Sequence, residues 1–179
     1  MCFPSELTLK TINGKVSLCR NLVDGIKQLR YDPHFWKNET VQPGENPLTD
    51  IQGDVFEIIM NIDLGKASGF EFNVRGTTVD YSVKEQKLSI MGTQISNPST
   101  DNCIKLRFII DRNSIGVYVN QGEVTFSKLF YPDPSNINLN LSSLGGPITV
   151  NNMEVYRLQS IWLKREQELG YYRSSVPNK

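Results

Sequence analysis

The chain has 179 residues, with 19 lysines and arginines against 19 aspartates and glutamates. That length suits one domain with a core large enough to fold without a disulfide or a metal. The balanced charge argues against a nucleic-acid binder and against a polybasic membrane contact, because both depend on a basic excess. No apolar run approaches the ~20 residues of a membrane span, and the N-terminus, MCFPSELTL, shows no signal-peptide pattern.

The first predicted elements form a hairpin. Asn13-Gly14 separates SELTLKTI (5–12) from KVSLCRN (15–21). Asn-Gly between two such runs is the strongest short-range signal for a tight hairpin turn. We therefore expect two antiparallel strands joined by a two-residue connection.

A helical turn and a long loop are predicted next. In NLVDGIKQLR (21–30), the apolar residues Val23, Ile26 and Leu29 recur at three-residue spacing, which predicts one helical turn. Residues 31–53 contain prolines, glycines and several acids. This composition predicts a loop that runs over the surface between sheets.

Alternation with period two dominates the middle of the chain. It is clearest in DVFEIIMNID (54–63), GFEFNVR (69–75) and IKLRFIID (104–111). Such alternation predicts strands with one face in a core and the other in water. The predicted core faces are Phe56, Ile58, Met60 and Ile62; Phe70, Phe72 and Val74; and Ile104, Leu106, Phe108 and Ile110.

The last third continues in the same way. DRNSIGVYVNQGE (111–123) reads as a strand between two turns, with Ile115, Val117 and Val119 in the core. Gly145-Gly146-Pro147 precedes a predicted final strand pair, ITV and MEVYRL.

The pattern as a whole predicts an all-β fold, an antiparallel two-sheet β-sandwich of the jelly-roll, concanavalin A-like kind, over residues 1–162. Short strands at close spacing with turn signals between them, about ten to twelve in number, are typical of such a sandwich. Residues 163–179 are polar and lack alternation, so we expect a C-terminal tail that forms a short helix ending at Gly170 or is disordered.

Residues that could carry catalysis are scarce. His34 is the one histidine and is expected to be a surface or packing residue. One histidine and three widely spaced cysteines, Cys2, Cys19 and Cys103, do not make a zinc motif, and the sequence leaves the cysteine pairing open. We expect no metal and no cofactor, since calcium loops and glycine-rich phosphate loops are also absent.

Carboxylate pairs of the kind that glycosidases use are not apparent either. Two carboxylates on one face of a strand would be spaced i, i+2. Asp54 and Glu57 should point to opposite faces, and Glu71 and Glu123 stand alone. These acids are therefore expected on solvated strand faces, and we predict no catalytic residue.

Aromatic side chains are the remaining candidates for a binding site. An exposed aromatic face complements the apolar face of a sugar ring. Trp36, in HFWKNET, is the best candidate for exposure, and Tyr31 and Tyr118 are the further candidates for carbohydrate binding. Tyr118 alternates with Val117 and Val119, so it should face away from the sandwich interior.

Several stretches, in their order, resemble the C-terminal β-sandwich module of glycoside hydrolase family 32, the family of levanases, inulinases and invertases. Residues 111–132 are similar to the family's Asp-Arg-x-Ser-Ile-Glu-Val-Phe-x-Asn-x-Gly-Glu segment, and 153–162 to its terminal strand. The resemblance covers residues 4–162. At its start, the matching residues are Pro4, Glu6, Leu7, Leu18, Asn21, Val23, Leu29 and Arg30.

The resemblance implies an accessory, non-catalytic role. In this family the catalytic carboxylates lie on an N-terminal β-propeller, in Trp-Met-Asn-Asp-Pro, Arg-Asp-Pro and Glu-Cys motifs. None of these motifs occurs here, since Asp32-Pro33 and Asp133-Pro134 lack the preceding residues. We therefore expect a module that is not an enzyme on its own. Its expected role is to stabilise a catalytic propeller, on the same or a separate chain, or that protein's assembly into oligomers.

Two alternatives stay open on the sequence alone. The first is this accessory module of a fructan- or sucrose-acting hydrolase. The second is a free-standing, lectin-like domain that binds fructan or another glycan. The sequence assigns no compartment; a secreted parent enzyme would place the domain outside the cell or in the periplasm.

One residue departs from the family pattern. Gly116 stands where the family's segment has a glutamate. A glycine inside a strand often marks a bulge or a close backbone approach. The departure also removes any contact that the glutamate would make with a partner domain.

Overall fold

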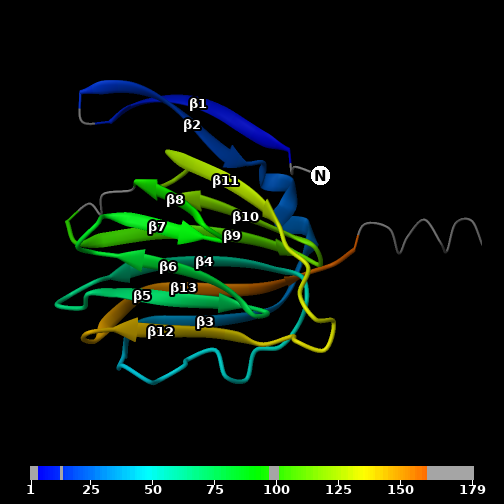
Figure 1. Cartoon of the computed structure of the whole chain (residues 1–179). Coiled ribbons are helices and arrows are strands. Elements are labelled where there is room, and N and C mark those ends of the chain that lie inside the picture. The colour runs from blue at the N-terminus through cyan, green and yellow to red at the C-terminus, as the bar shows by residue number, and fades with distance from the viewer. Residues whose placement is uncertain (1–3, 13, 97–100, 161–179) are drawn as a thin grey trace, which may run out of the picture.

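The computed structural model describes residues 4–12, 14–96 and 101–160, which form thirteen strands and one short 3-10 helix (Figure 1). Two sheets face each other, and a two-stranded hairpin lies at one end of the molecule. No helix in the described ranges is long and apolar enough to cross a membrane. The predicted tail, 163–179, lies outside the described residues.

All strand pairs are antiparallel. The hairpin consists of β1 (Ser5–Ile12) and β2 (Lys15–Leu22), followed by the 3-10 helix η1 (Asp24–Leu29). The six-stranded sheet has the order β11 (Val124–Leu129), β10 (Ser114–Val119), β9 (Cys103–Asp111), β4 (Phe56–Asp63), β13 (Ile148–Leu158) and β3 (Arg30–Val41). The five-stranded sheet has the order β12 (Leu139–Leu144), β5 (Gly69–Val74), β6 (Thr77–Ser82), β7 (Lys87–Ile90) and β8 (Thr93–Ser96).

The core fills the space between the two large sheets, as the alternation predicts. Every residue of the predicted core faces in β4, β5, β9 and β10 is buried. Phe72 of one sheet and Phe108 of the other lie with ring centroids 4.9 Å apart. The antiparallel β-sandwich is confirmed.

The N-terminal predictions are confirmed as well. Ile12 pairs with Lys15, which leaves a two-residue connection between β1 and β2. The predicted helical turn is present as η1, whose three residues per turn match the three-residue spacing of its apolar side chains. Ile26 is buried there.

The prediction of a loop over residues 31–53 is wrong in its first half. Residues 30–41 form β3, an edge strand that pairs with β13. Pro33 is tolerated because an edge strand needs ladder hydrogen bonds on one side only. The pairing shifts register between Val155 and Arg157, opposite Asp32-Pro33, and Asp32 has a positive φ of 49°. The bulge accommodates Asp32-Pro33 within the strand, and this dipeptide is what makes the sequence resemble a loop.

The predicted final strand pair, ITV and MEVYRL, is in fact one strand. β13 runs through both segments, with a register shift between Val150 and Asn152 in its pairing with β4. A β-bulge adds one residue without ending the strand. The break in alternation at Asn151 therefore reflects a bulge and not a turn.

A second, smaller apolar cluster lies on the outer face of the six-stranded sheet. It joins Leu22 of β2 and Ile26 of η1 to Ile109, Tyr118 and Leu158 of the sheet. This cluster attaches the N-terminal segment to the sandwich. The outer face of this sheet is thus covered at one end by β2 and η1.

Candidate functional site

A glutamate is fully buried on the outer face of the six-stranded sheet. Glu57 of β4 accepts hydrogen bonds from Arg30 Nε and one terminal nitrogen at 2.7 and 2.9 Å, and from Arg107 Nε at 2.6 Å. The hydrogen bond to Glu57 raises the pKa of Arg30 above its usual value. The Arg30 guanidinium also lies 4.2 Å from the ring centroid of Tyr156. The expectation of a solvated strand face is wrong for Glu57.

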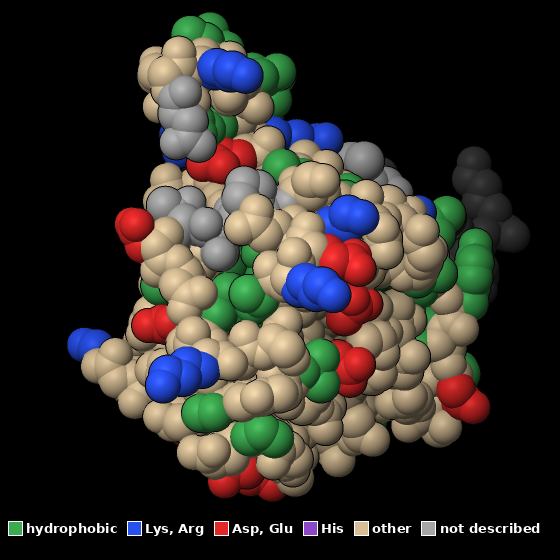
Figure 2. Space-filling model, turned by 60° about the vertical axis from the view of Figure 1, so that its left-hand side comes forward, with side chains coloured by type: hydrophobic (Ala, Val, Ile, Leu, Met, Phe, Trp, Pro, Cys, Tyr) green, Lys and Arg blue, Asp and Glu red, His purple; other side chains and the backbone are tan. Residues whose placement is uncertain are grey.

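The outward face of the hairpin is apolar and exposed. Leu9 and Leu18 are directly paired across β1 and β2 and are 72% and 58% exposed, and Leu7 and Val16 on the same face are exposed too. Figure 2 shows the hairpin standing out from the body of the molecule, with hydrophobic side chains on it. We call these four residues the hairpin face. Large side chains clustered in this way usually mark an interaction surface.

The opposite side of the hairpin is held by the turn after β10. Arg20 N donates to Gly122 O at 2.9 Å, and Lys10 Nζ donates to Gln121 Oε1 at 3.2 Å. Gly122 has a φ of 86°, and a Cβ added there would overlap the carbonyl oxygen of Arg20. The turn can therefore approach β2 only because residue 122 is glycine.

The structure does not bring the three predicted aromatic residues together. Tyr31 and Trp36 lie on β3, whereas Tyr118 lies on β10, and three strands separate β10 from β3. Tyr118 faces away from the sandwich interior, as predicted, but is only 8% exposed because β2 and η1 cover it. Tyr31 is exposed.

The expectation that Trp36 is exposed is wrong. Trp36 packs partly against the main core and stacks on His34, with ring centroids 6.3 Å apart. Its neighbour Phe35 is 63% exposed and meets Tyr156 edge to face at 6.0 Å. Strand alternation in β3 turns Phe35 outward and Trp36 inward, which a loop assignment could not foresee.

No described group of three or more histidine, cysteine, aspartate or glutamate side chains could hold a metal ion. Cys19 and Cys103 are free thiols, and Cys2 lies outside the described residues. Burial, followed by the nearby carboxylates of Asp63 and Asp101, raises the pKa of the Cys103 thiol. A smaller fraction of this thiol is therefore ionised at neutral pH than of an ordinary cysteine.

Gly116 marks neither a bulge nor a close approach. It pairs in regular register with Ile109 on one side and Ser127 on the other. A Cβ added there would meet only ordinary contacts, at 3.7 Å from the Tyr118 ring and 3.8 Å from Ile109 O and Ser127 Oγ. The backbone of this strand does not require glycine.

We therefore expect Gly116→Ala to raise the free energy of unfolding by about 0.5–1 kcal/mol, because glycine in a strand interior carries an entropic cost. Urea unfolding of both forms measures the difference. Gly69→Ala is the matched control: its Cβ would overlap the carbonyl oxygen of Tyr81, so it should destabilise the chain. A loss of stability in Gly116→Ala would contradict the prediction.

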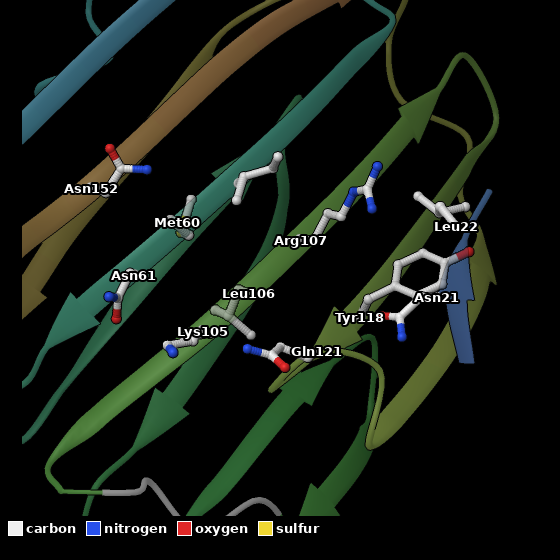
Figure 3. Close-up of a pocket in the computed structure, with 11 residues that line it drawn as sticks. Asn21, Leu22, Met60, Asn61, Lys105, Leu106, Arg107, Tyr118, Gln121 and Asn152 are labelled. Atoms are coloured by element: carbon white, nitrogen blue, oxygen red, sulfur yellow. The ribbon is translucent and has the colours of Figure 1, made fainter. Parts of the chain in front are cut away.

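A groove lies between β2 and the outer face of the six-stranded sheet. Its volume is about 330 Å³. Figure 3 shows its residues spread across β13, β4, β9 and β10, with β2 at one side. We call it the amide groove, because four side-chain amides line it: Asn21, Asn61, Gln121 and Asn152. The other side chains on this face that line it are Leu22, Ile59, Lys105, Arg107 and Tyr118.

A second hollow adjoins the amide groove and shares Asn61, Lys105 and Gln121 with it. Its volume is about 420 Å³, and Asp101 and Glu123 line it. The sequence analysis did not single out the amides of the groove. Alternation places Asn61 on an outer face, between Met60 and Ile62, but only the pairing of Asn61 with Asn152 joins β4 and β13 into one polar surface.

The described part of the chain is thus an antiparallel β-sandwich with an exposed apolar hairpin and a polar groove, and it contains no cluster of metal-ligating side chains. The sequence profile of "Glycosyl hydrolases family 32 C terminal" matches residues 25–157. The chain belongs to this family of C-terminal modules.

Relatives agree in sequence and in fold. A levanase of Bacillus subtilis (strain 168) is 28% identical over 183 residues, which cover 89% of this chain and 27% of the levanase. The crystal structure of exo-inulinase from Aspergillus awamori has a TM-score of 0.76 at 21% identity, covering 90% of this chain and 36% of that chain. Fructan 1-exohydrolase IIa from Cichorium intybus, in complex with 1-kestose, has a TM-score of 0.64 at 16% identity, covering 89% and 41%. The chain thus spans about a quarter to two fifths of these proteins.

Proposed function

We propose that this chain is a non-catalytic accessory module that docks on the catalytic β-propeller of a fructan- or sucrose-acting glycoside hydrolase and stabilises it. The hairpin face carries the proposal, because its four apolar side chains form an unpartnered patch in the described structure. Burying each side chain contributes about 1.5–3 kcal/mol. Relatives carry the same module within a longer chain that includes a catalytic domain.

The proposal can be tested by mixing the purified chain with the catalytic part of the Bacillus subtilis levanase, prepared without its own matching segment. We expect a one-to-one complex in analytical ultracentrifugation and a higher melting temperature of the catalytic part. The double substitution Leu9→Ser with Leu18→Ser should abolish both effects. Leu129→Ser is the control, since Leu129 is 61% exposed but belongs to β11.

If the complex forms equally well with the hairpin substitutions, the hairpin face is not the docking surface. If no complex forms at all, the docking function is contradicted. The chain alone should release no fructose from levan, inulin or sucrose. Sustained release that survives repurification would overturn the non-catalytic assignment.

Glycan binding is the second candidate function, and the amide groove is the observation that favours it. Of the three aromatic residues singled out in the sequence, Tyr118 lines this groove, whereas Trp36 and Tyr31 lie on the opposite edge strand. Carbohydrate binding at Trp36 and Tyr31 would therefore need a separate site on β3. The exposed Tyr31 is the better placed of these two.

A further inference from the structure

The amide groove has the size of a small-ligand site. Its volume of about 330 Å³ falls at the lower end of the range for ligand pockets in proteins. One wall is β2, the other is the sheet, and Leu22 and Tyr118 join the two by their contact in the smaller apolar cluster. The attachment of the hairpin therefore fixes the width of the groove.

Side-chain amides dominate its polar lining. Each amide offers both donors and an acceptor, which matches a ligand whose hydroxyl groups also donate and accept. Asn61 Oδ1 is buried and has no hydrogen-bond partner among the described residues. This oxygen is shielded as it stands, so a ligand could donate to it only after the amide turns into the groove. An unsatisfied buried acceptor costs about 1–3 kcal/mol, which favours that turn when a ligand donor is present.

The orientation of two further amides is fixed by the protein itself. Asn152 Nδ2 donates to Glu154 Oε1 at 3.1 Å, and Gln121 Oε1 accepts from Lys10. Their remaining atoms, the carbonyl oxygen of Asn152 and the amino group of Gln121, keep their hydrogen-bonding capacity. Figure 3 shows Asn152 and Gln121 at two sides of the groove, with Asn61 and Lys105 between them.

The groove also has an apolar portion. Leu22, Ile59 and Tyr118 line it beside the amides. A sugar ring presents hydroxyl groups at its rim and C–H groups on its faces, and it is bound best by polar groups beside an apolar or aromatic surface. The mixed lining fits such a ring better than it fits a purely apolar ligand.

The charges of the groove favour a neutral ligand. Glu57 pairs with both Arg107 and Arg30, so its single negative charge offsets one of these two guanidinium groups. Asp101 and Glu123 in the adjoining hollow supply two further negative charges against Lys105 and the remaining arginine charge. A phosphate or carboxylate group would find no excess of positive charge here.

We propose that the amide groove binds one neutral sugar unit through Asn61, Asn152 and Gln121, beside the apolar lining formed by Ile59 and the edge of Tyr118. This inference rests on the second candidate function alone. Its failure would leave docking through the hairpin face untouched, and failure of docking would leave the groove intact. The unit is either a free mono- or disaccharide or the end of a polysaccharide, and the two sources share the same chemistry.

The test is a ¹H–¹⁵N chemical-shift titration of the whole labelled chain. The probes are D-fructose, D-glucose and sucrose as free sugars, levan as a polymer, and glucose 6-phosphate as a charged control. Additions up to about 50 mM detect dissociation constants in the millimolar range. We expect shifts of the Asn61 and Asn152 side-chain amides and of the Gln121 backbone amide with at least one neutral probe, and weaker shifts with the phosphate. A response to levan but not to free sugars would assign the end of a polysaccharide as the ligand.

Substitutions locate the binding. Asn61→Ala should weaken it roughly three- to ten-fold, which corresponds to one lost hydrogen bond. Asn140→Ala is the matched control, because Asn140 is an exposed strand asparagine of β12 on the other sheet. If Asn61→Ala disturbs the whole spectrum, Asn152→Ala serves for the same comparison. No shift with any neutral probe, shifts that map elsewhere, or unchanged affinity in the groove variants would overturn the proposal.

Discussion

Replacement of Glu57 by glutamine should lower the free energy of unfolding by about 3 kcal/mol, because two arginines lose their shared counter-charge within a covered surface. Glutamine keeps the shape of the side chain, so the loss measures charge and hydrogen bonding rather than a cavity. Arg30 and Arg107 reach Glu57 from η1's end and from β9, respectively. The substitution should therefore loosen the N-terminal segment as well as the sheet.

Equilibrium unfolding in urea measures this effect. Glu71→Gln is the matched control, since Glu71 is an exposed glutamate at the centre of β5 and should change stability by less than about 0.5 kcal/mol. If the free energy of unfolding of Glu57→Gln lies within about 1 kcal/mol of that of the unsubstituted chain, the ion pairs contribute little to stability. The fold would then tolerate the buried charge of Glu57 without being stabilised by it.

Replacement of Gly122 by alanine should lower the free energy of unfolding by about 2–4 kcal/mol. About 1–2 kcal/mol arises from a left-handed backbone with a Cβ, and the rest from overlap with the backbone of β2. The turn after β10 must then move away from Arg20, and the hydrogen bond from Arg20 N to Gly122 O breaks. Since an isolated two-stranded hairpin is marginal in water, β1 and β2 should lose protection.

Two measurements separate these causes. Urea unfolding gives the total cost, and hydrogen exchange at the Arg20 amide reports on the hairpin. Gly44→Ala is the control, because Gly44 has a similar φ of 88° but no heavy atom within 4 Å of the added Cβ. Gly44→Ala should lower the free energy of unfolding only by the cost of a left-handed backbone at a residue with a Cβ. Equal losses in the two variants would show that contact between hairpin and turn is unimportant.

Local pattern was sufficient to predict the sandwich. Alternation placed Ile58 and Phe108 in the core, and Asn-Gly predicted the first turn, because each depends on residues close in sequence. β3 was missed since Pro33 and the neighbouring acids mimic a loop. Its strand conformation depends on pairing with β13, more than a hundred residues away.

The polar sites could not be predicted for the same reason. Glu57 looks like any outward strand residue until Arg30 and Arg107 are placed beside it by separate elements. Asn61 and Asn152 belong to one groove only through the pairing of β4 with β13. Sequence shows which face a side chain occupies, but the partners on that face come from the order of strands in the sheet.

The irregular start of β3 has a consequence for how copies of this module can associate. Pro33 lacks an amide hydrogen, and the bulge at Asp32 bends the free rim of the six-stranded sheet. An incoming strand from another molecule cannot form an unbroken ladder there, which is how natural sheets avoid edge-to-edge aggregation. Sheet extension is thus interrupted at the Asp32-Pro33 end of β3, which shortens the stretch of this edge that another strand could pair with.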